Sequence, residues 1–167
     1  QLEGLALRLV PVKSKGDPIY GMIGNGRVNT DKYYDNFMTK IKWGNFDKMK
    51  LFVDNSYGPT IQTTRFGALR TARTMLDRGD KDRAVELVDK YFEAFPHMNF
   101  PYDANTILFI NIYAQAGDME NVKKHMRILA KETADQLEFI ESLGSYRELG
   151  YDNAYSNFMR AREDMTR

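Results

Sequence analysis

Apolar and polar positions follow different patterns on the two sides of residue 60. Before it, glycines and prolines interrupt short apolar runs, and after it long runs repeat with the 3.6-residue period of amphipathic helices. The pattern predicts an all-α fold, with an N-terminal extension over residues 1–60 packed on a helical region over residues 61–167. The opening run LEGLALRLVPV is interrupted by Glu3 and Arg8, so we expect a short extended strand or buried segment there and not a signal peptide.

Within the extension, residues 30–43 carry the pattern of a capped amphipathic helix. Thr30 or Asn29 can cap its first turn, and Gly44 stands where a left-handed residue ends a helix. The apolar positions at i, i+3, i+4 and i+7 are Tyr34, Phe37, Met38 and Ile41. We expect this face to pack on the helical region, which leaves Tyr33 among the outward-facing residues.

A helix–turn–helix unit occurs twice in the helical region. The stretches 76–96 and 113–132 each contain a Gly-Asp turn between two helical patterns. The first unit matches the tetratricopeptide repeat, with the small residues Ala72 and Ala84 where two helices cross closely. Neighbouring helix pairs of such repeats bury their apolar stripes against one another.

A third helix pair is expected at 133–149 and 151–165, with Gly150 between its helices. The sequence therefore predicts a tetratricopeptide-like helix-pair solenoid of about three pairs. It carries an N-terminal irregular segment and one docked amphipathic helix.

Four polar residues fall at positions that face the concave groove in tetratricopeptide repeats. Arg73 and Asp77 take these positions in the first unit, and Asn111 and Gln115 take them in the second. Polar side chains there hold a peptide or partner backbone in that fold. The alternative is an ordinary solvated helix face.

Composition and motifs argue against several other classes of function. The 24 basic residues nearly balance the 23 acidic ones, whereas nucleic-acid binders carry a strongly basic surface. There is no cysteine, and His97 and His125 lack a second ligand at helical spacing, so no metal or cofactor is expected. The glycines of GMIGNGR (21–27) lack the spacing of a phosphate-binding loop and predict a turn. No nucleophile motif occurs, so we expect no catalytic residue and no enzyme activity in this chain.

The stretch GRVNTDKYYDNFMTKIKWGN (26–45), with LEGLALRLVPVK before it and FPYDANTILFINIYAQAGDMENV after it, resembles one known family. These are large multi-spanning membrane proteins of Gram-negative bacteria, catalogued as a domain of unknown function and similar to protein O-mannosyltransferases and other lipid-linked-sugar glycosyltransferases. The resemblance covers residues 2 to about 143 and departs from the family motif at Asn29 and Tyr33. The matching motif positions include Arg27, Asp31, Tyr34, Asn36 and Trp43.

The resemblance implies a soluble domain that follows the last transmembrane helix and lies on the periplasmic side of the inner membrane. The family's acidic transferase residues belong to the membrane half, so none is carried over to this chain. The motif at 26–45 would dock its helix and aromatic residues on the first repeat. The expected partner is a protein or peptide, or the membrane-embedded part of the same chain.

Two alternatives remain open at this point. The aromatic and polar residues of segment 26–57 could form a glycan-binding or accessory catalytic module. That module would need exposed rings in a groove, among them Tyr33 and Trp43. The repeat pattern alone also fits a cytoplasmic scaffold.

Overall fold

The computed structural model describes residues 1–11 and 27–166. Within that part of the chain it contains six α-helices and no β-sheet, and two isolated bridges join Leu2 to Leu7 and to Val28. The all-α class predicted from the sequence is therefore confirmed. The chain divides into two compact units, Gln1–Asn99 and Phe100–Arg167.

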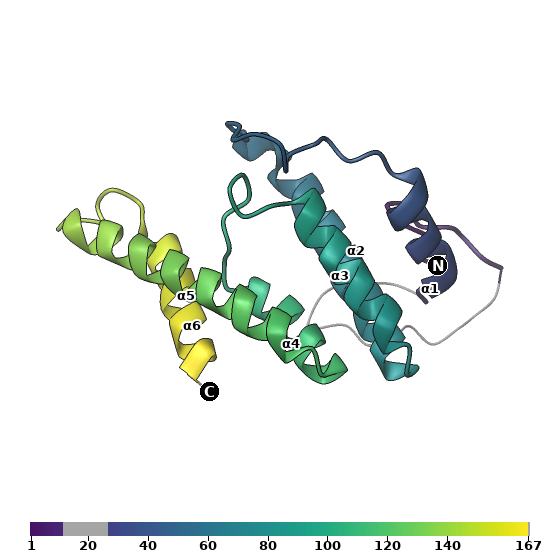
Figure 1. Cartoon of the computed structure of the whole chain (residues 1–167). Coiled ribbons are helices and arrows are strands. Elements are labelled where there is room, and N and C mark those ends of the chain that lie inside the picture. Colours follow the sequence, from purple (N-terminus) through teal and green to yellow (C-terminus); the bar gives the residue numbers. More distant parts are fainter. Residues whose placement is uncertain (12–26, 167) are drawn as a thin grey trace. The chain divides into compact units, whose positions relative to one another are not determined.

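The first unit is built on a helical hairpin of α2 (Gly58–Asp77) and α3 (Lys81–Ala94), which lie side by side (Figure 1). Ala72 and Ala84 are fully buried, as expected for small residues where helices approach closely. Larger side chains complete this core: Leu69, Met75, Leu87, Val88 and Tyr91. Burial of each large apolar side chain stabilises the fold by about 1.5–3 kcal/mol, so this hairpin supplies much of the unit's stability.

A short N-terminal helix packs on this hairpin. It consists of α1 (Thr30–Asp35) and a π-helical turn, η1 (Asn36–Lys40), and Asn29 caps it by accepting a hydrogen bond from the Lys32 amide. The predicted end at residue 43 is wrong, because Ile41 already has an extended conformation. Gly44 does not cap the helix. An added Cβ at Gly44 would lie 2.8 Å from the Phe46 ring, so the glycine makes room for that ring.

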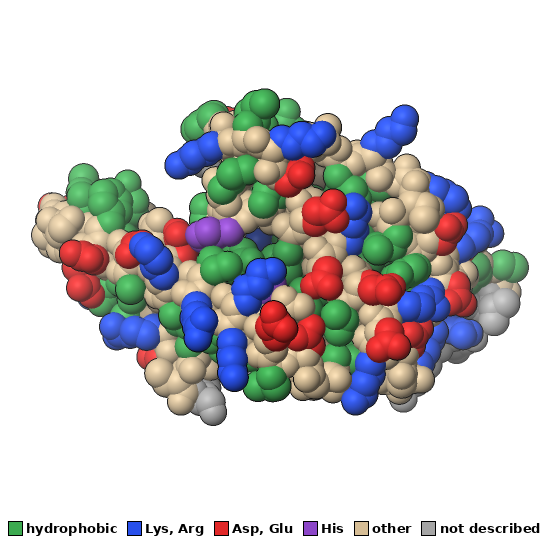
Figure 2. All heavy atoms as spheres, in the orientation of Figure 1, with side chains coloured by type: hydrophobic (Ala, Val, Ile, Leu, Met, Phe, Trp, Pro, Cys, Tyr) green, Lys and Arg blue, Asp and Glu red, His purple; other side chains and the backbone are tan. Residues whose placement is uncertain are grey.

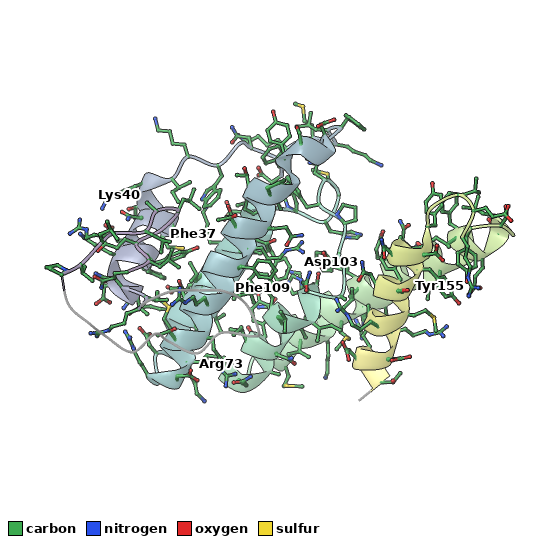
Figure 3. All side chains as sticks on the ribbon, turned by 180° about the vertical axis from the view of Figure 1, so that it is seen from behind. Phe37, Lys40, Arg73, Asp103, Phe109 and Tyr155 are labelled. Carbon is green, nitrogen blue, oxygen red and sulfur yellow. The ribbon has the colours of Figure 1, made fainter. Side chains whose placement is uncertain are left out.

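The buried face of this helix also differs from the prediction. Tyr33 is fully buried beside Phe37, whereas Tyr34 is only partly buried. The spacings 33/37 and 34/37 both fit one face of a helix, so periodicity could not choose between the two tyrosines. Gly67 of α2 decides it, since its missing side chain leaves the space that the Tyr33 ring occupies. Figure 3 shows Phe37 directed from this helix toward α2.

The first eleven residues form an irregular segment. The Leu2 amide donates to the Arg27 carbonyl over 2.8 Å, and the Asn29 amide donates to the Leu2 carbonyl over 3.0 Å, which ties the segment to the start of α1. Beyond this point Leu5, Leu7 and Leu9 are exposed, Leu9 almost completely. The expectation of a buried segment or a regular strand is therefore wrong, because among the described residues of this segment Leu2 alone hydrogen-bonds through its backbone to the chain around Val28, at Arg27 and Asn29.

The second unit contains α4 (Thr106–Ala116), α5 (Met119–Ser142) and α6 (Asp152–Thr166). Helix α5 packs against both α4 and α6. The predicted third pair does not begin at residue 133, because α5 continues without a break to Ser142. No glycine or proline interrupts residues 119–142, so nothing in that stretch ends the helix. The turn before α6 does contain Gly150, in the left-handed conformation.

The turns after α2 and α4 have the same geometry. Gly79 and Gly117 have left-handed φ angles of 84° and 96°, which glycine adopts without strain. The amides of Asp80 and Asp118 each donate to the carbonyl five residues earlier, over 2.9 Å in both cases. These hydrogen bonds close a Schellman motif at the end of each helix. The two Gly-Asp turns predicted from the sequence are thus present and alike.

Candidate functional site

Two of the four predicted groove residues meet on α2. The Arg73 guanidinium and the Asp77 carboxylate, one helical turn apart, form an ion pair with an Nε–Oδ1 distance of 3.1 Å. Arg73 is half-buried and Asp77 is exposed. Figure 3 shows Arg73 toward the C-terminal end of α2. An exposed pair of this kind adds little stability, but it presents both hydrogen-bond donors and acceptors at a fixed place.

The other two predicted residues lie on α4, in the second unit. Asn111 and Gln115 are both exposed and stand one turn apart on the same face of the helix. They follow Arg73 and Asp77 by 38 residues each, the same offset that separates Gly79 from Gly117. The two pairs belong to different compact units.

The residues of α1 that belong to the stretch 26–45 contact α3. The Asp31 carboxylate pairs with the Arg83 guanidinium at 2.8 Å, and the same guanidinium lies 4.5 Å from the centre of the Tyr34 ring. The Tyr34 hydroxyl donates to the Glu86 carboxylate. Burial, followed by this hydrogen bond and the charge of Glu86, raises the pKa of Tyr34 to about 12. These contacts cross from the motif to the helical hairpin and hold α1 against it.

The remaining motif residues also make contacts within the first unit. The Asn36 side-chain amide donates to the Glu3 carbonyl over 3.0 Å, and the Trp43 indole donates to the Phe37 carbonyl over 3.3 Å. The Trp43 ring lies 4.6 Å from Phe37 and 5.6 Å from Phe95, measured between ring centres. Arg27 is exposed, and its backbone carbonyl accepts a hydrogen bond from the Leu2 amide.

A hollow of about 330 Å³ lies beside Trp43. Asn45 stands at its wall with a φ of 57°, a left-handed conformation that non-glycine residues seldom adopt. Lys90 and Glu93 of α3 form an ion pair of 2.9 Å on the other side. Sequence reasoning missed this hollow because its two walls come from segments about fifty residues apart, with no shared motif.

The second unit holds a larger groove of about 730 Å³ between α5 and α6. Its lining is mainly apolar, with exposed Ala130 and Ala134 spaced one turn apart, and Arg162 stands at its edge. Thr133 is buried there, and its hydroxyl has no hydrogen-bond partner among the described residues. The sequence offered one signal for this groove, two alanines spaced one helical turn apart on α5.

His125 is a core residue of the second unit. Its side chain is only 3% exposed, its ring stacks on Tyr113 at 5.4 Å between centres, and its Nδ1 lies 2.7 Å from the Tyr102 hydroxyl. Burial is the main reason that the pKa of His125 falls to about 4. The histidine is therefore neutral near pH 7 and acts as part of the packing, the structural role that the sequence favoured.

The described residues contain no group of three or more His, Cys, Asp or Glu side chains arranged to hold a metal ion. None of the helices in residues 1–11 and 27–166 is long and apolar enough to cross a membrane. The glycine-rich stretch 21–26 lies outside the described residues. Comparison with family models, with curated proteins and with solved structures gave no match.

Proposed function

We propose that this chain is a non-catalytic, tetratricopeptide-like interaction domain of a larger membrane protein that resembles lipid-linked-sugar glycosyltransferases. It holds an acceptor protein, a partner subunit or a loop of its own membrane-embedded part. The proposal assigns no reaction, metal or cofactor to the domain.

The observation that carries this proposal is the repeated polar pair on the first helix of two similarly built helix pairs. Helices α2 and α4 end in the same glycine turn, and each presents two polar residues one turn apart: Arg73 with Asp77, and Asn111 with Gln115. Repeats of helical-repeat proteins contribute residues to concave binding surfaces, and each of these polar pairs lies within its own unit. Guanidinium and amide groups at such positions can hydrogen-bond a peptide backbone in any sequence context.

Peptide binding tests this role directly. Random peptides displayed on phage are selected against the full chain, and the affinity of a selected peptide is measured by calorimetry. We expect Arg73→Ala or Asn111→Ala, according to the unit that holds the peptide, to weaken binding about tenfold, the effect of losing one hydrogen bond to a charged or polar group. Lys123→Ala, at an exposed position on α5, is the control and should bind normally. Equal affinities for all four proteins would contradict the proposal.

Attachment to a membrane protein, with this domain on the periplasmic side, rests on the resemblance of residues 26–45. The coding sequence before Gln1 is expected to encode consecutive hydrophobic spans. Alkaline phosphatase fused after this domain in the full-length protein should be active, since that enzyme folds only outside the cytoplasm. An inactive phosphatase fusion together with a fluorescent cytoplasmic reporter fusion would favour the cytoplasmic alternative.

A second candidate function is glycan binding at the hollow beside Trp43. The hollow offers sugar rings an aromatic surface, the Trp43 indole. It also offers polar groups that can hydrogen-bond sugar hydroxyls: the Asn45 amide and the carboxylates of Asp47 and Glu93. Tyr33 cannot contribute, because it is fully buried. Oligosaccharides are titrated while the fluorescence of Trp43, the single tryptophan, is followed. Saturable quenching of the Trp43 fluorescence would support this candidate if Glu93→Gln weakens the binding and Arg73→Ala leaves it unchanged. The absence of a response at millimolar sugar would exclude it.

A further inference from the structure

The first unit carries a cluster of exposed apolar side chains at one end of α2. Phe52 is 93% exposed, Met49 is 60% exposed and Tyr57 is 62% exposed. Leu51 and Met98 are exposed to about 40% each. We call these five residues the apolar tip. Isolated exposed apolar residues are common, but a contiguous group marks an interaction surface.

Asn99 fixes the backbone that presents the tip. The residue is only 7% exposed, and its side-chain amide nitrogen donates to the carbonyls of Phe46 and Met49 over 2.6 Å and 2.8 Å. Its amide oxygen accepts from the Leu51 amide over 2.7 Å. Because these hydrogen bonds hold the loop from inside, the apolar side chains are kept outward and cannot collapse onto the core.

Lysines alternate with the apolar residues of the tip. Lys48 and Lys50 are exposed, and neither has an ion-pair partner among the described residues. The acidic residues of the segment stand outside the stretch 48–52, at Asp47 and Asp54. Figure 2 shows hydrophobic side chains gathered where Figure 1 places the segment leading into α2, with basic side chains on both sides.

We propose that the apolar tip inserts shallowly into the surface of a lipid bilayer that contains anionic lipid. Phe52, Leu51 and Met49 enter the boundary between headgroups and acyl chains, the depth at which amphipathic surfaces bind. Lys48 and Lys50 lie along that boundary, with their aliphatic stems against the apolar layer and their ammonium groups on lipid phosphates. Tyr57 suits the same boundary because its ring is apolar and its hydroxyl is polar.

The lysines favour a bilayer over a protein partner. Lysine is depleted from the central, desolvated part of protein–protein interfaces, whereas here Lys48 and Lys50 stand on either side of the exposed Met49. At a membrane surface the same arrangement is favourable, since each ammonium stays hydrated among negative headgroups. This inference goes beyond the proposed interaction role and does not rest on it.

Vesicle binding by the full chain tests the inference. Sedimentation is measured with vesicles of phosphatidylcholine alone and with vesicles that also contain phosphatidylglycerol. We expect the chain to bind the anionic vesicles. The double variant Leu51→Asp/Phe52→Asp should bind them at least about tenfold more weakly, because charged groups must leave the apolar layer. Lys48→Gln and Lys50→Gln should each weaken it about fivefold on anionic vesicles only. Leu149→Asp, which adds a charge at a half-exposed leucine of the second unit, is the matched control and should bind normally.

A label gives an independent readout. The chain has no cysteine, so an environment-sensitive dye can be attached to Met49→Cys alone. Its emission should shift to the blue with anionic vesicles, while the same dye at Leu149→Cys should not shift. Unchanged sedimentation of the double aspartate variant, or no binding to anionic vesicles, would overturn the inference. A dimer detected by ultracentrifugation, and dissociated by Phe52→Asp, would also overturn the inference. The apolar tip would then contact a second copy of the chain and not a bilayer. None of these outcomes affects peptide binding at Arg73 and Asn111.

Discussion

Replacing Tyr33 by phenylalanine is expected to stabilise the protein, although Tyr33 is fully buried. Its hydroxyl has no hydrogen-bond partner among the described residues. Burial raises the pKa of Tyr33 well above its usual range, as expected for a phenol in apolar surroundings. An unsatisfied buried hydroxyl costs about 1–3 kcal/mol, so Tyr33→Phe should raise the free energy of unfolding by about 1 kcal/mol after the lost packing of one oxygen atom is subtracted.

The neighbouring glycine provides a second, coupled perturbation. Gly67 lies inside α2, where alanine is favoured over glycine by about 1 kcal/mol. An alanine Cβ at this position would lie only 2.8 Å from the Tyr33 hydroxyl oxygen but 3.4 Å or more from the nearest ring carbons. Gly67→Ala alone should therefore destabilise the protein by about 1–2 kcal/mol, because the clash exceeds the gain in helix propensity. In the Tyr33→Phe background the clash is absent, and the same change should stabilise the protein by up to about 1 kcal/mol.

Chemical denaturation of the four proteins measures this double-mutant cycle. Trp43 lies in the same unit and contacts Phe37, so its fluorescence reports the unfolding of the unit that contains the pair. The expected coupling energy is about 2 kcal/mol, well above the deviation seen for independent sites. If Tyr33→Phe lowers stability by more than about 1 kcal/mol, the hydroxyl is satisfied in solution and the reasoning fails. An equal effect of Gly67→Ala in both backgrounds would show that α1 does not dock on α2 in this way.

Three further predictions test other parts of the fold. In chemical denaturation, Ala84→Glu should lower the free energy of unfolding by more than about 3 kcal/mol, because it places bulk and charge in the α2–α3 core. The control Ala134→Glu, at an exposed alanine, should lower it by under about 1 kcal/mol. Asn99→Ala should cost about 2–4 kcal/mol and speed hydrogen exchange at the Leu51 amide, since three hydrogen bonds are lost. The pKa of His125 is about 4 in the folded protein and about 6.5 in the unfolded chain. The contribution of His125 to the free energy of unfolding is therefore complete above pH 6.5 and is lost as pH falls toward 4, a loss on the order of 3 kcal/mol. This loss should be absent in His125→Gln when unfolding is measured across that pH range.

Local chemistry made several elements predictable from the sequence. Gly79 and Gly117 each precede an aspartate between helical patterns, and the left-handed conformation of a Schellman turn selects glycine. The Asn29 cap depends only on a side chain and an amide three residues away. The helical period alone also predicted that Asn111 and Gln115 lie one turn apart on the same face of a helix, and the structure shows both exposed.

Features that depend on distant residues could not be predicted in this way. Nothing near Lys90 indicates that it faces the loop around Trp43, because that proximity is created by the docking of α1 and the following loop. The continuity of α5 past residue 133 was hidden for another reason: the expectation of a regular repeat outweighed the absence of any helix-breaking residue. Asn99 shows the same limit, since its three partners lie about fifty residues away.

The sequence by itself determined the helical class, the two glycine turns and the burial of Ala72 and Ala84, because backbone conformation and helical periodicity act over a few neighbouring residues. Only the tertiary structure decided that Tyr33 and not Tyr34 faces the core, since the space for its ring exists opposite Gly67 of another helix. It also decided that Phe52 stays exposed, because a buried asparagine far along the chain holds its loop outward.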